Sequence, residues 1–564
     1  MFACVKLCGP RGRILFIAGL IISLIHGIAS VLSVLFIGSF LNQLDVHLQA
    51  STGICLLLIL LVLGLSAYFS NIVFSAFTAE FHGGLLHRAG NSLAHMQMRS
   101  LEKLQNGDVL TRTNSDLGIV STYFQRHATV LISGLSSLAT GCVLLFFISW
   151  EILLVIVLCS TLFTLITLRF GQPLNVAHKK WREAQSEVAI YASDIVAGQQ
   201  DIKSMGLSDT VLKTYQEAQQ KWIDKFRVRN RIRAWQRGSH SINSVIVFVC
   251  VPVLGAIFAA QGIMQIGTVF TAVQMSNQIA SPIMNLDWWF RLYREMKISL
   301  QRVKEIIEQP MERENGEGVS LEAGQPLVEF EDVSFSYGIS PVLRGVSLRI
   351  LPGEHVAIVG ESGSGKTTLL RMIAGLYTPD RGVIRFGGMD IARWDLESLR
   401  SHLSLVDQET YLYPISLRNN ITCGMAGQDL EGAVRKSLLE NWVKAQREGL
   451  DTMILERGAN LSGGLKQRIS IARALWRSPS LFLFDEPTSA LNSEMETELL
   501  ETIKKVSEKT ASVTIAHRLY TIMDADKIYA LKNGQVIESG THKELMEAQG
   551  YYYTLYMSQR GEIL

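Results

Sequence analysis

The feature of this sequence that most constrains its fold is a set of five long stretches without Asp, Glu, Lys or Arg. They cover residues 14–41, 52–79, 128–150, 152–168 and 241–286. About 20 apolar residues of helix cross the hydrocarbon core of a bilayer. The last stretch is long enough for two such helices, joined by a turn near Gln261, Gly262 and Gly267. We therefore expect residues 1–308 to form a helical domain with six transmembrane helices. Their expected ranges are about 14–41, 52–79, 128–150, 152–170, 241–262 and 267–290.

The connecting segments alternate in their content of basic residues. Lys and Arg are absent from residues 42–51, from the turn at Trp150 and from residues 261–267, whereas 80–127 contain five and 169–240 contain thirteen. Short cytoplasmic loops are enriched in Lys and Arg, so we expect both termini to be cytoplasmic. The two basic segments are long and carry apolar positions at helical spacing, which indicates that membrane helices continue into the cytoplasm.

The composition agrees with a membrane protein that carries a soluble part. Charged residues make up 18% of the chain, below the roughly 25% of soluble proteins, and the mean hydropathy is positive. A net charge of +2 gives no reason to expect a nucleic-acid partner. The seven cysteines form no CxxC pair and are interpreted as free thiols. The first apolar run lacks a signal-peptide cleavage site, so we expect it to be retained as the first membrane helix.

A phosphate-binding loop follows a polar linker at residues 309–327. The apolar strand 355–359 leads into the sequence GESGSGKT at 360–367, and an apolar helix follows, which is the context that such a loop requires. Its backbone N–H groups would wrap the phosphates, Lys366 would reach the terminal phosphates, and Thr367 would ligate Mg²⁺. We expect residues 328–564 to form an α/β ATPase domain. The expected ATP-binding residues of the loop are Gly360, Glu361, Ser362, Gly363, Ser364, Gly365, Lys366, Thr367 and Thr368.

Two acidic residues end a second apolar strand. Asp485 and Glu486 follow the sequence LFLF at 481–484. Asp485 is expected to hold Mg²⁺ through water, and Glu486 to accept a proton from the water that attacks ATP. The alternative is a strand end with two solvated acids, which fits a chain with a phosphate-binding loop less well.

Further motifs resemble those of the ABC (ATP-binding cassette) transporters. The sequence LSGGLKQR at 461–468 resembles the ABC signature. With it come, in the family's order, Tyr337 of the adenine-stacking loop, Gln408 of the Q-loop, Glu456–Gly458 of the X-loop, Ser489–Asn492 of the D-loop and the switch histidine His517. Gly107–Asp108 with Asn114–Asp116, and Ile195–Gly198 through Lys203, resemble the two intracellular loops of ABC exporters, which end in short coupling helices that dock on the ATPase domain. The resemblance covers nearly the whole chain and is to the exporter-type (type IV) half-transporter.

This resemblance implies specific roles in ATP hydrolysis. Glu486, His517, Lys366 and Gln408 would be catalytic; Thr367, Gln408 and Asp485 would hold Mg²⁺; and Tyr337 would stack on the adenine. Ser462, Gly463 and Gly464 would open a helix whose N-terminus binds the γ-phosphate held by a second subunit. The implied partner is a second half-transporter, and we expect a homodimer because one chain carries every motif. Two residues depart from the family pattern: Leu465 replaces a Gln in the signature, and Asn492 replaces an Asp, which would loosen communication between the two sites.

The implied function is ATP-driven export of an amphipathic compound, a peptide or a lipid by alternating access, in the bacterial plasma (inner) membrane. Two alternatives stay open. Some importers of siderophores or metal chelates share this fold, and an ATP-gated channel or regulatory subunit would tolerate loss of hydrolysis. The presence of Glu486 and His517 argues against the channel.

The sixth expected span has a polar face that predicts where a substrate binds. Thr271, Gln274, Gln278, Ser281, Asn285 and Trp288 recur at spacings of three and four residues, which places them on one face of a helix. Amides that face lipid are costly, so this face either lines a watery cavity or bonds to neighbouring helices. Asp287 and Arg291 lie beside Trp288 near the cytoplasmic end, and this mixture favours a substrate cavity. It is expected to include Gln274, Gln278, Ser281, Asn285 and Trp288.

Overall fold

The structure is a computed structural model that describes residues 8–43, 50–313, 316, 324–338, 340–425, 429–487, 501, 503–505, 510–516 and 519–560. The chain divides into two compact units. The first comprises Met1–Ala94 with Gln105–Glu308, and the second comprises His95–Leu104 with Gln309–Leu564. The first unit is helical and the second contains two β-sheets, as the sequence predicted.

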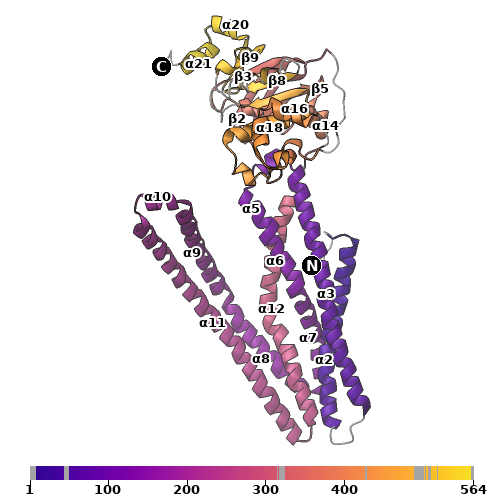
Figure 1. Cartoon of the computed structure of the whole chain (residues 1–564). Coiled ribbons are helices and arrows are strands. Elements are labelled where there is room, and N and C mark those ends of the chain that lie inside the picture. The colour runs from indigo at the N-terminus through magenta and orange to yellow at the C-terminus, as the bar shows by residue number, and fades with distance from the viewer. Residues whose placement is uncertain are drawn as a thin grey trace. The chain divides into compact units, whose positions relative to one another are not determined.

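Long helices make up the first unit (Figure 1). They are α2 (Pro10–Gln43), α3 (Ala50–His95), α7 (Thr129–Ile148), α8 (Trp150–Arg169), α9 (Gly171–Ala197), α11 (Ser208–Ala260) and α12 (Ile266–Ile307). Four short segments lead into α7: α5 (Asn106–Leu110), the π-helix η1 (Thr111–Asp116), α6 (Leu117–Thr122) and the π-helix η2 (Tyr123–Ala128). The helix α10 (Gln199–Ser204) joins α9 to α11, and these two run side by side (Figure 1).

Five of the described helical segments are long and apolar enough to cross a membrane. They are Pro10–Asn42, Gly53–His95, Gly107–Ile148, Trp150–Ala197 and Ser208–Ala260. Within the described ranges, α12 falls outside this set, because amide and hydroxyl side chains interrupt its apolar run. The helices also extend beyond the apolar runs, since charged residues such as Glu, Lys and Arg still favour helix. The turn between α11 and α12 spans residues 261–265 and includes Gly262 at φ +73°, close to its expected position.

Two apolar clusters hold the first unit together. One contains five phenylalanine rings from α2, α3 and η2, namely Phe16, Phe74, Phe77, Phe81 and Phe124, together with Tyr123. The other surrounds Met275 and Ile279 of α12. The tightest contact joins α2 to α12, where a Cβ added to Gly38 would lie 1.7 Å from Thr271 Oγ1, and one added to Gly267 would lie 2.1 Å from the Gly38 carbonyl oxygen. Glycine at both positions therefore permits the two backbones to approach.

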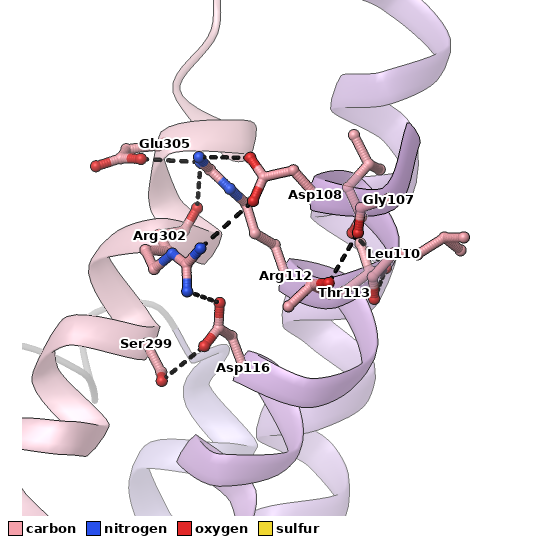
Figure 2. A network of polar contacts seen from close by, with 11 residues as sticks. Gly107, Asp108, Leu110, Arg112, Thr113, Asp116, Ser299, Arg302 and Glu305 are labelled. Carbon is pink, nitrogen blue, oxygen red and sulfur yellow. Dashed lines mark hydrogen bonds and ion pairs between the residues drawn. The ribbon is translucent and has the colours of Figure 1, made fainter. Parts of the chain in front are cut away.

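An ionic network joins α12 to the α5–η1 segment (Figure 2). Its members are Asp108, Arg112, Asp116, Ser299, Arg302 and Glu305. Arg112 contacts one carboxylate on each side, Asp108 Oδ2 at 2.8 Å and Glu305 Oε2 at 2.8 Å. Asp116, whose side chain is only 7% exposed, lies 3.3 Å from Arg302 Nη1 and accepts a hydrogen bond from Ser299 at 2.8 Å. Since π-helical turns are rare and often lie at functional sites, η1 is a notable place for a buried carboxylate.

The second unit contains the two sheets. The smaller has the strand order β2 (Pro341–Ile350), β1 (Val328–Ser336), β4 (Arg381–Phe386) and β5 (Met389–Asp390), all antiparallel. The larger has the order β10 (Gln535–Gly540), β9 (Lys527–Lys532), β3 (His355–Val359), β8 (Ala511–Ile515), β7 (Leu481–Asp485) and β6 (Leu403–Val406). All of its pairs are parallel except β10 with β9. The carboxyl ends of parallel strands are where ligands bind in open α/β sheets.

The helices of this unit flank the sheets. They are α4 (Met98–Leu101), α13 (Lys366–Ile373), α14 (Leu396–Ser401), α15 (Leu417–Thr422), α16 (Leu430–Lys436), α17 (Glu440–Ala445), α18 (Gly463–Arg477), α20 (His542–Glu547) and α21 (Tyr551–Arg560). The start of the expected linker is held in place, because Glu312 forms a two-point ion pair with Arg400 at 2.7 and 2.8 Å. The linker's remaining residues lie mostly outside the described ranges.

Candidate functional site

The loop between β3 and α13 has a backbone that requires glycine. Gly360, Gly363 and Gly365 have φ values of +152°, +81° and +103°, in the region that L-residues with a side chain avoid. A Cβ on Gly360 would lie 2.2 Å from the Leu531 carbonyl oxygen. Two N–H groups of the loop donate within the protein, that of Glu361 to the Tyr551 hydroxyl and that of Ser364 to the Glu361 carbonyl oxygen. The loop ends at the N-terminus of α13, where the helix dipole favours an anion.

The polar side chains of this loop fit a polyphosphate. Ser364 is buried and its hydroxyl has no hydrogen-bond partner among the described residues, so a ligand oxygen would satisfy a group that is otherwise costly to bury. Lys366 Nζ donates to the Gly360 and Glu361 carbonyl oxygens, at 2.9 Å each. Burial lowers the pKa of Lys366, and the nearby carboxylates of Glu486 and Asp485 partly offset this effect. The ammonium group is thus held among polar atoms that a phosphate can replace.

The two acids at the end of β7 lie beside the loop and have different surroundings. Asp485 is only 4% exposed; burial raises the pKa of its carboxyl, while a hydrogen bond from Thr367 and the charges of Arg371 and Lys366 lower it. The structure thus brings together Thr367 and Asp485, two oxygen ligands of the kind that Mg²⁺ prefers. Glu486 is more exposed and belongs to the turn after the strand.

Glu486 is held in an unusual backbone conformation. Its φ is +49°, which is rare for residues other than glycine and is common at active sites. Its N–H donates to the Ile515 carbonyl oxygen at 3.1 Å, and its own carbonyl accepts from Gln467 Nε2 at 3.2 Å. Gln408 Nε2 donates to Glu486 Oε2 at 2.8 Å, so the structure brings together two residues that the sequence analysis had grouped.

Gln467 is a site residue that the sequence analysis did not single out. It lies within the signature string, in the middle of α18, and its side chain is 2% exposed. A buried amide on a helix that buries mainly apolar residues was the available signal, because such a group requires a partner. That partner is the backbone of Glu486.

Tyr337 lies at the end of β1 and contacts the phosphate loop. Its hydroxyl lies 3.1 Å from Thr368 Oγ1, and its ring meets those of Phe335 and Tyr377 edge-on at 5.0 and 5.2 Å. The Tyr377 hydroxyl in turn donates a hydrogen bond to Glu102 Oε1. Burial and the Glu102 carboxylate raise the pKa of Tyr377 above its ordinary value.

Glu102 follows α4, whose residues pack on the core of the second unit. Met98 contacts the apolar cluster of the sheets. Arg99 donates to the Ser336 carbonyl oxygen at 2.6 Å and pairs with Asp380 at 3.2 Å. The resemblance placed a coupling helix in this loop. The docked helix is α4, which ends at Leu101, whereas Gly107 already lies in α5. Neither Arg99 nor Glu102 had been singled out from the sequence.

The signature residues open α18 as predicted. Ser462 is the N-cap and accepts a hydrogen bond from the Leu465 N–H at 3.4 Å, and Gly463 and Gly464 form the first turn. Leu465 packs against the apolar cluster around Leu412, which accounts for an apolar residue at this position. Two further predictions, His517 and Ser489–Asn492, lie outside the described residues.

The polar face of α12 divides into two parts. Gln274 and Ser281 are exposed, whereas Met275, Ile279 and Pro282 are buried on the other side of the helix. Two members make contacts within the bundle: Thr271 is buried against Gly38, and Gln278 Nε2 donates to the Ser30 carbonyl oxygen of α2 at 3.1 Å. Asn285 donates to Ser281 of its own helix at 2.9 Å, and Trp288 is 38% exposed. Thr271 and Gln278 thus follow the helix-bonding alternative, and the other positions leave polar groups accessible.

Comparison with known proteins agrees with these features. Residues 16–283 match the family described as ABC transporter transmembrane region, and residues 343–489 match the family described as ABC transporter. The ATP-dependent lipid A-core flippase of Alkalilimnicola ehrlichii is 43% identical over 265 residues, which is 46% of this chain and less than half, 45%, of that relative. The leukotoxin translocation ATP-binding protein LktB of Mannheimia glucosida is 28% identical over 97% of this chain and 78% of its own length. A solved bacterial Atm1-family ABC exporter with ATP bound has the same fold, with a TM-score of 0.78, 23% identity, and coverage of 97% of this chain and 98% of that one.

Proposed function

Because the chain belongs to the ABC transporter family, with a transmembrane region and an ATPase in one polypeptide, we propose that it exports an amphipathic compound, a peptide or a lipid as a homodimer. ATP binding would close two ATPase domains and hydrolysis would reset them, so that the membrane helices open to alternate sides. The protein is integral to the membrane; the proposed site is the bacterial plasma (inner) membrane, with α12 as the sixth span and both termini in the cytoplasm.

A continuous series of contacts from α4 to the phosphate loop carries this proposal. Glu102 accepts the Tyr377 hydrogen bond, the Tyr377 ring touches Tyr337, and the Tyr337 hydroxyl reaches Thr368. Arg371 of α13 also lies 3.9 Å from Glu102. Since α4 follows the membrane helix α3 along the chain, an adenine that stacks on Tyr337 would alter contacts that end at a membrane helix.

The residues around the loop support ATP hydrolysis. Bound Mg²⁺–ATP would supply the phosphoanhydride bond and a cation that neutralises its oxygens. Lys366 would exchange the Gly360 and Glu361 carbonyl oxygens for terminal phosphate oxygens, and Thr367, Asp485 and Gln408 would hold the metal. Glu486, which Gln408 and Gln467 position, would accept the proton of the attacking water at its carboxylate. His517 is proposed to contact the γ-phosphate.

The dimer is proposed from the N-terminus of α18. Its first turn presents the N–H groups of Gly463 and Gly464 beside the Ser462 hydroxyl, an arrangement suited to a phosphate. In the family this phosphate is bound to the other subunit. Mass measurement of the purified complex tests the composition: a stable complex with a different half-transporter would contradict the homodimer.

Transport in reconstituted vesicles tests the function and its direction. Wild-type chain should move a fluorescent amphipath out of the compartment that contains ATP, and Glu486→Gln is the matched control because it removes the proposed base alone. Accumulation on the ATP side would instead favour the siderophore or metal-chelate importer. ATP-dependent ion conductance without movement of any amphipath would favour the channel.

Cysteine scanning tests the cavity on α12. In a cysteine-depleted background without nucleotide, Gln274→Cys, Gln278→Cys and Ser281→Cys should react with a water-soluble thiol reagent, and a transported compound should protect them. Cysteines at 275, 279 and 286 should not react. We expect Gln278→Cys to react more slowly than the other two, because this position packs on α2. Equal reactivity on both faces would remove this face from the substrate path.

A further inference from the structure

An open pocket of about 510 Å³ lies between α11 and α12. Its lining includes Arg233, Gln236 and Arg237 of α11, and Asn285, Trp288 and Arg291 of α12. The residues between these two groups, 238–284, contain no Asp, Glu, Lys or Arg. The pocket therefore lies where both helices leave the apolar part of the membrane, on the side that the basic segments assign to the cytoplasm.

The charges of the pocket are unbalanced. Arg233 and Arg237 are one helical turn apart on α11, and like charges at this spacing repel each other. Neither has a carboxylate within ion-pair distance among the residues that the structure describes. Arg291 forms an ion pair of 3.3 Å with Asp287 of its own helix. Three of the side chains that line the pocket are thus guanidinium groups, and none of the lining residues is an acid.

The arginine one turn before Arg233 provides a contrast within the same helix. Arg229 is 9% exposed; its guanidinium lies 4.1 Å from the centre of the Trp181 ring, and Nη2 donates to Asn230 at 2.8 Å. The protein itself supplies the partners of Arg229. Arg233 and Arg237 are exposed, so a ligand can supply theirs.

The pocket also has an aromatic wall that continues into the polar face of α12. The Trp288 indole is 38% exposed and packs edge-on against His127 at 5.1 Å. Beyond Asn285, the exposed positions of α12 continue through Ser281 to Gln274. An indole at this level suits the boundary between the polar and apolar parts of a ligand. An inorganic ion has no apolar part that could pack against the indole.

We propose that this pocket binds the anionic head group, a phosphate or carboxylate, of the amphipathic substrate on its cytoplasmic side. The guanidinium groups of Arg233, Arg237 and Arg291 hold the oxygens, as Arg does for planar or bidentate anions, and Trp288 packs on the start of the apolar portion. The inference rests on the proposed export function for the ligand's role as a substrate. Binding itself requires neither ATP nor turnover, which allows the two to be tested separately.

The experiment measures equilibrium binding without nucleotide to the full chain in nanodiscs of phosphatidylcholine, with empty nanodiscs as the blank. The probes are dioctanoyl phosphatidic acid, dioctanoylglycerol, which has the same chains without the anion, and inorganic phosphate, which has the anion without chains. Phosphatidic acid should bind saturably and at least about tenfold more tightly than either control, and its affinity should fall with added salt.

Substitutions test the assigned residues. Arg233→Gln and Arg237→Gln should each weaken phosphatidic acid binding about fivefold, as expected for partly exposed charge pairs, and the double variant by roughly 25-fold. Trp288→Ala should weaken it, whereas Trp288→Phe should retain most of the affinity. Arg231→Gln and Arg294→Gln are matched controls, because both arginines are exposed on the same two helices and outside the pocket. Binding of a fluorescent ATP analogue verifies that each variant is folded; if one arginine variant fails, the other and Trp288→Ala still decide the question.

Several outcomes would overturn the proposal. Equal affinity for dioctanoylglycerol would indicate a purely apolar site, and equal affinity for inorganic phosphate would indicate a site for small anions. Equal losses in the Arg231 and Arg294 controls would indicate attraction by general surface charge. If phosphatidic acid binds as expected but no anionic amphipath is transported, the export function fails and the binding site stands. If transport proceeds with unchanged affinity in the double variant, the binding site fails and the export function stands.

Discussion

Replacing Arg302 by Met tests whether the network of Figure 2 fastens α12 to η1. Asp116 has two polar partners there, Arg302 Nη1 at 3.3 Å and Ser299 Oγ at 2.8 Å. Its side chain is 7% exposed, whereas that of Arg302 is 43% exposed. Arg302→Met would leave a buried carboxylate with a single hydrogen bond, while most of the apolar stem of residue 302 is kept.

The magnitude follows from this difference in burial. Removing one partner of a fully buried ion pair costs about 3–5 kcal/mol, because the other charge stays buried. Since Arg302 is partly hydrated, we expect the lower end, about 3 kcal/mol, or roughly 6–12 °C in Tm for a domain of this size. The double variant Asp116→Asn with Arg302→Met should lose only about 1 kcal/mol, since an amide fills the same space and still accepts from Ser299.

The assay is thermal unfolding of the purified protein in one detergent at one scan rate, because membrane proteins often unfold irreversibly. Lys179→Met is the matched control, since its pair with Glu183 is 3.9 Å long and its side chain is 81% exposed; it should show no measurable shift. An Arg302→Met shift no larger than that of Lys179→Met would refute the reasoning. So would a double variant less stable than Arg302→Met alone, because the two residues would then act independently.

Three further changes probe the site and the packing. Glu486→Gln should retain ATP binding but lower the rate of phosphate release by about 10² to 10⁴, as for loss of a positioned base; release at the wild-type rate would contradict its role. Burial lowers the pKa of His355 below its unfolded value, so the unfolded chain binds the proton first, and the ATPase unit should lose stability as pH falls below about 6.5. His355→Gln should reduce this loss in unfolding followed by fluorescence. Gly38→Ala should lower Tm by the equivalent of about 1–3 kcal/mol, because its Cβ would lie 1.7 Å from Thr271 Oγ1, whereas Gly64→Ala, with no atom within 4 Å, should not.

The features that the sequence predicted well are those that depend on local chemistry. A continuous apolar stretch of about 20 residues crosses a bilayer as a helix, which satisfies its backbone hydrogen bonds internally, so the centres of the helices followed directly from it. The phosphate loop needs glycines at fixed spacing, and the structure has Gly360, Gly363 and Gly365 in conformations that only glycine adopts readily. Likewise, Ser462 caps a helix through a hydrogen bond within its own turn.

Contacts between distant segments were not predictable in the same way. Glu102 and Tyr377 are 275 residues apart and Asp116 and Ser299 are 183 apart. No periodicity in the sequence relates them, because such pairs depend on which elements become neighbours in the fold. Gln408 and Glu486 were grouped only through resemblance. Their contact arises because β6 and β7, the strands that precede them, pair in register from Leu403–Leu481 onward.

The polar residues of α12 explain both a success and a limit of hydropathy. Gln274, Gln278 and Asn285 lower the helix's hydropathy, so that among the described helices it is not recognised as a span, while α11 before it is. The same amide side chains are costly to expose to lipid. Because α12 packs against α2, α7 and α8, these amides are expected to contact water, a ligand or another helix. Gln278 meets that requirement through Ser30 of α2. Gln274 has no such partner among the described residues, and Asn285 bonds to its own helix beside Trp288 and the unbalanced arginines. The polar residues that lower the hydropathy of α12 are therefore the ones that support its place beside the proposed path of a polar-headed substrate.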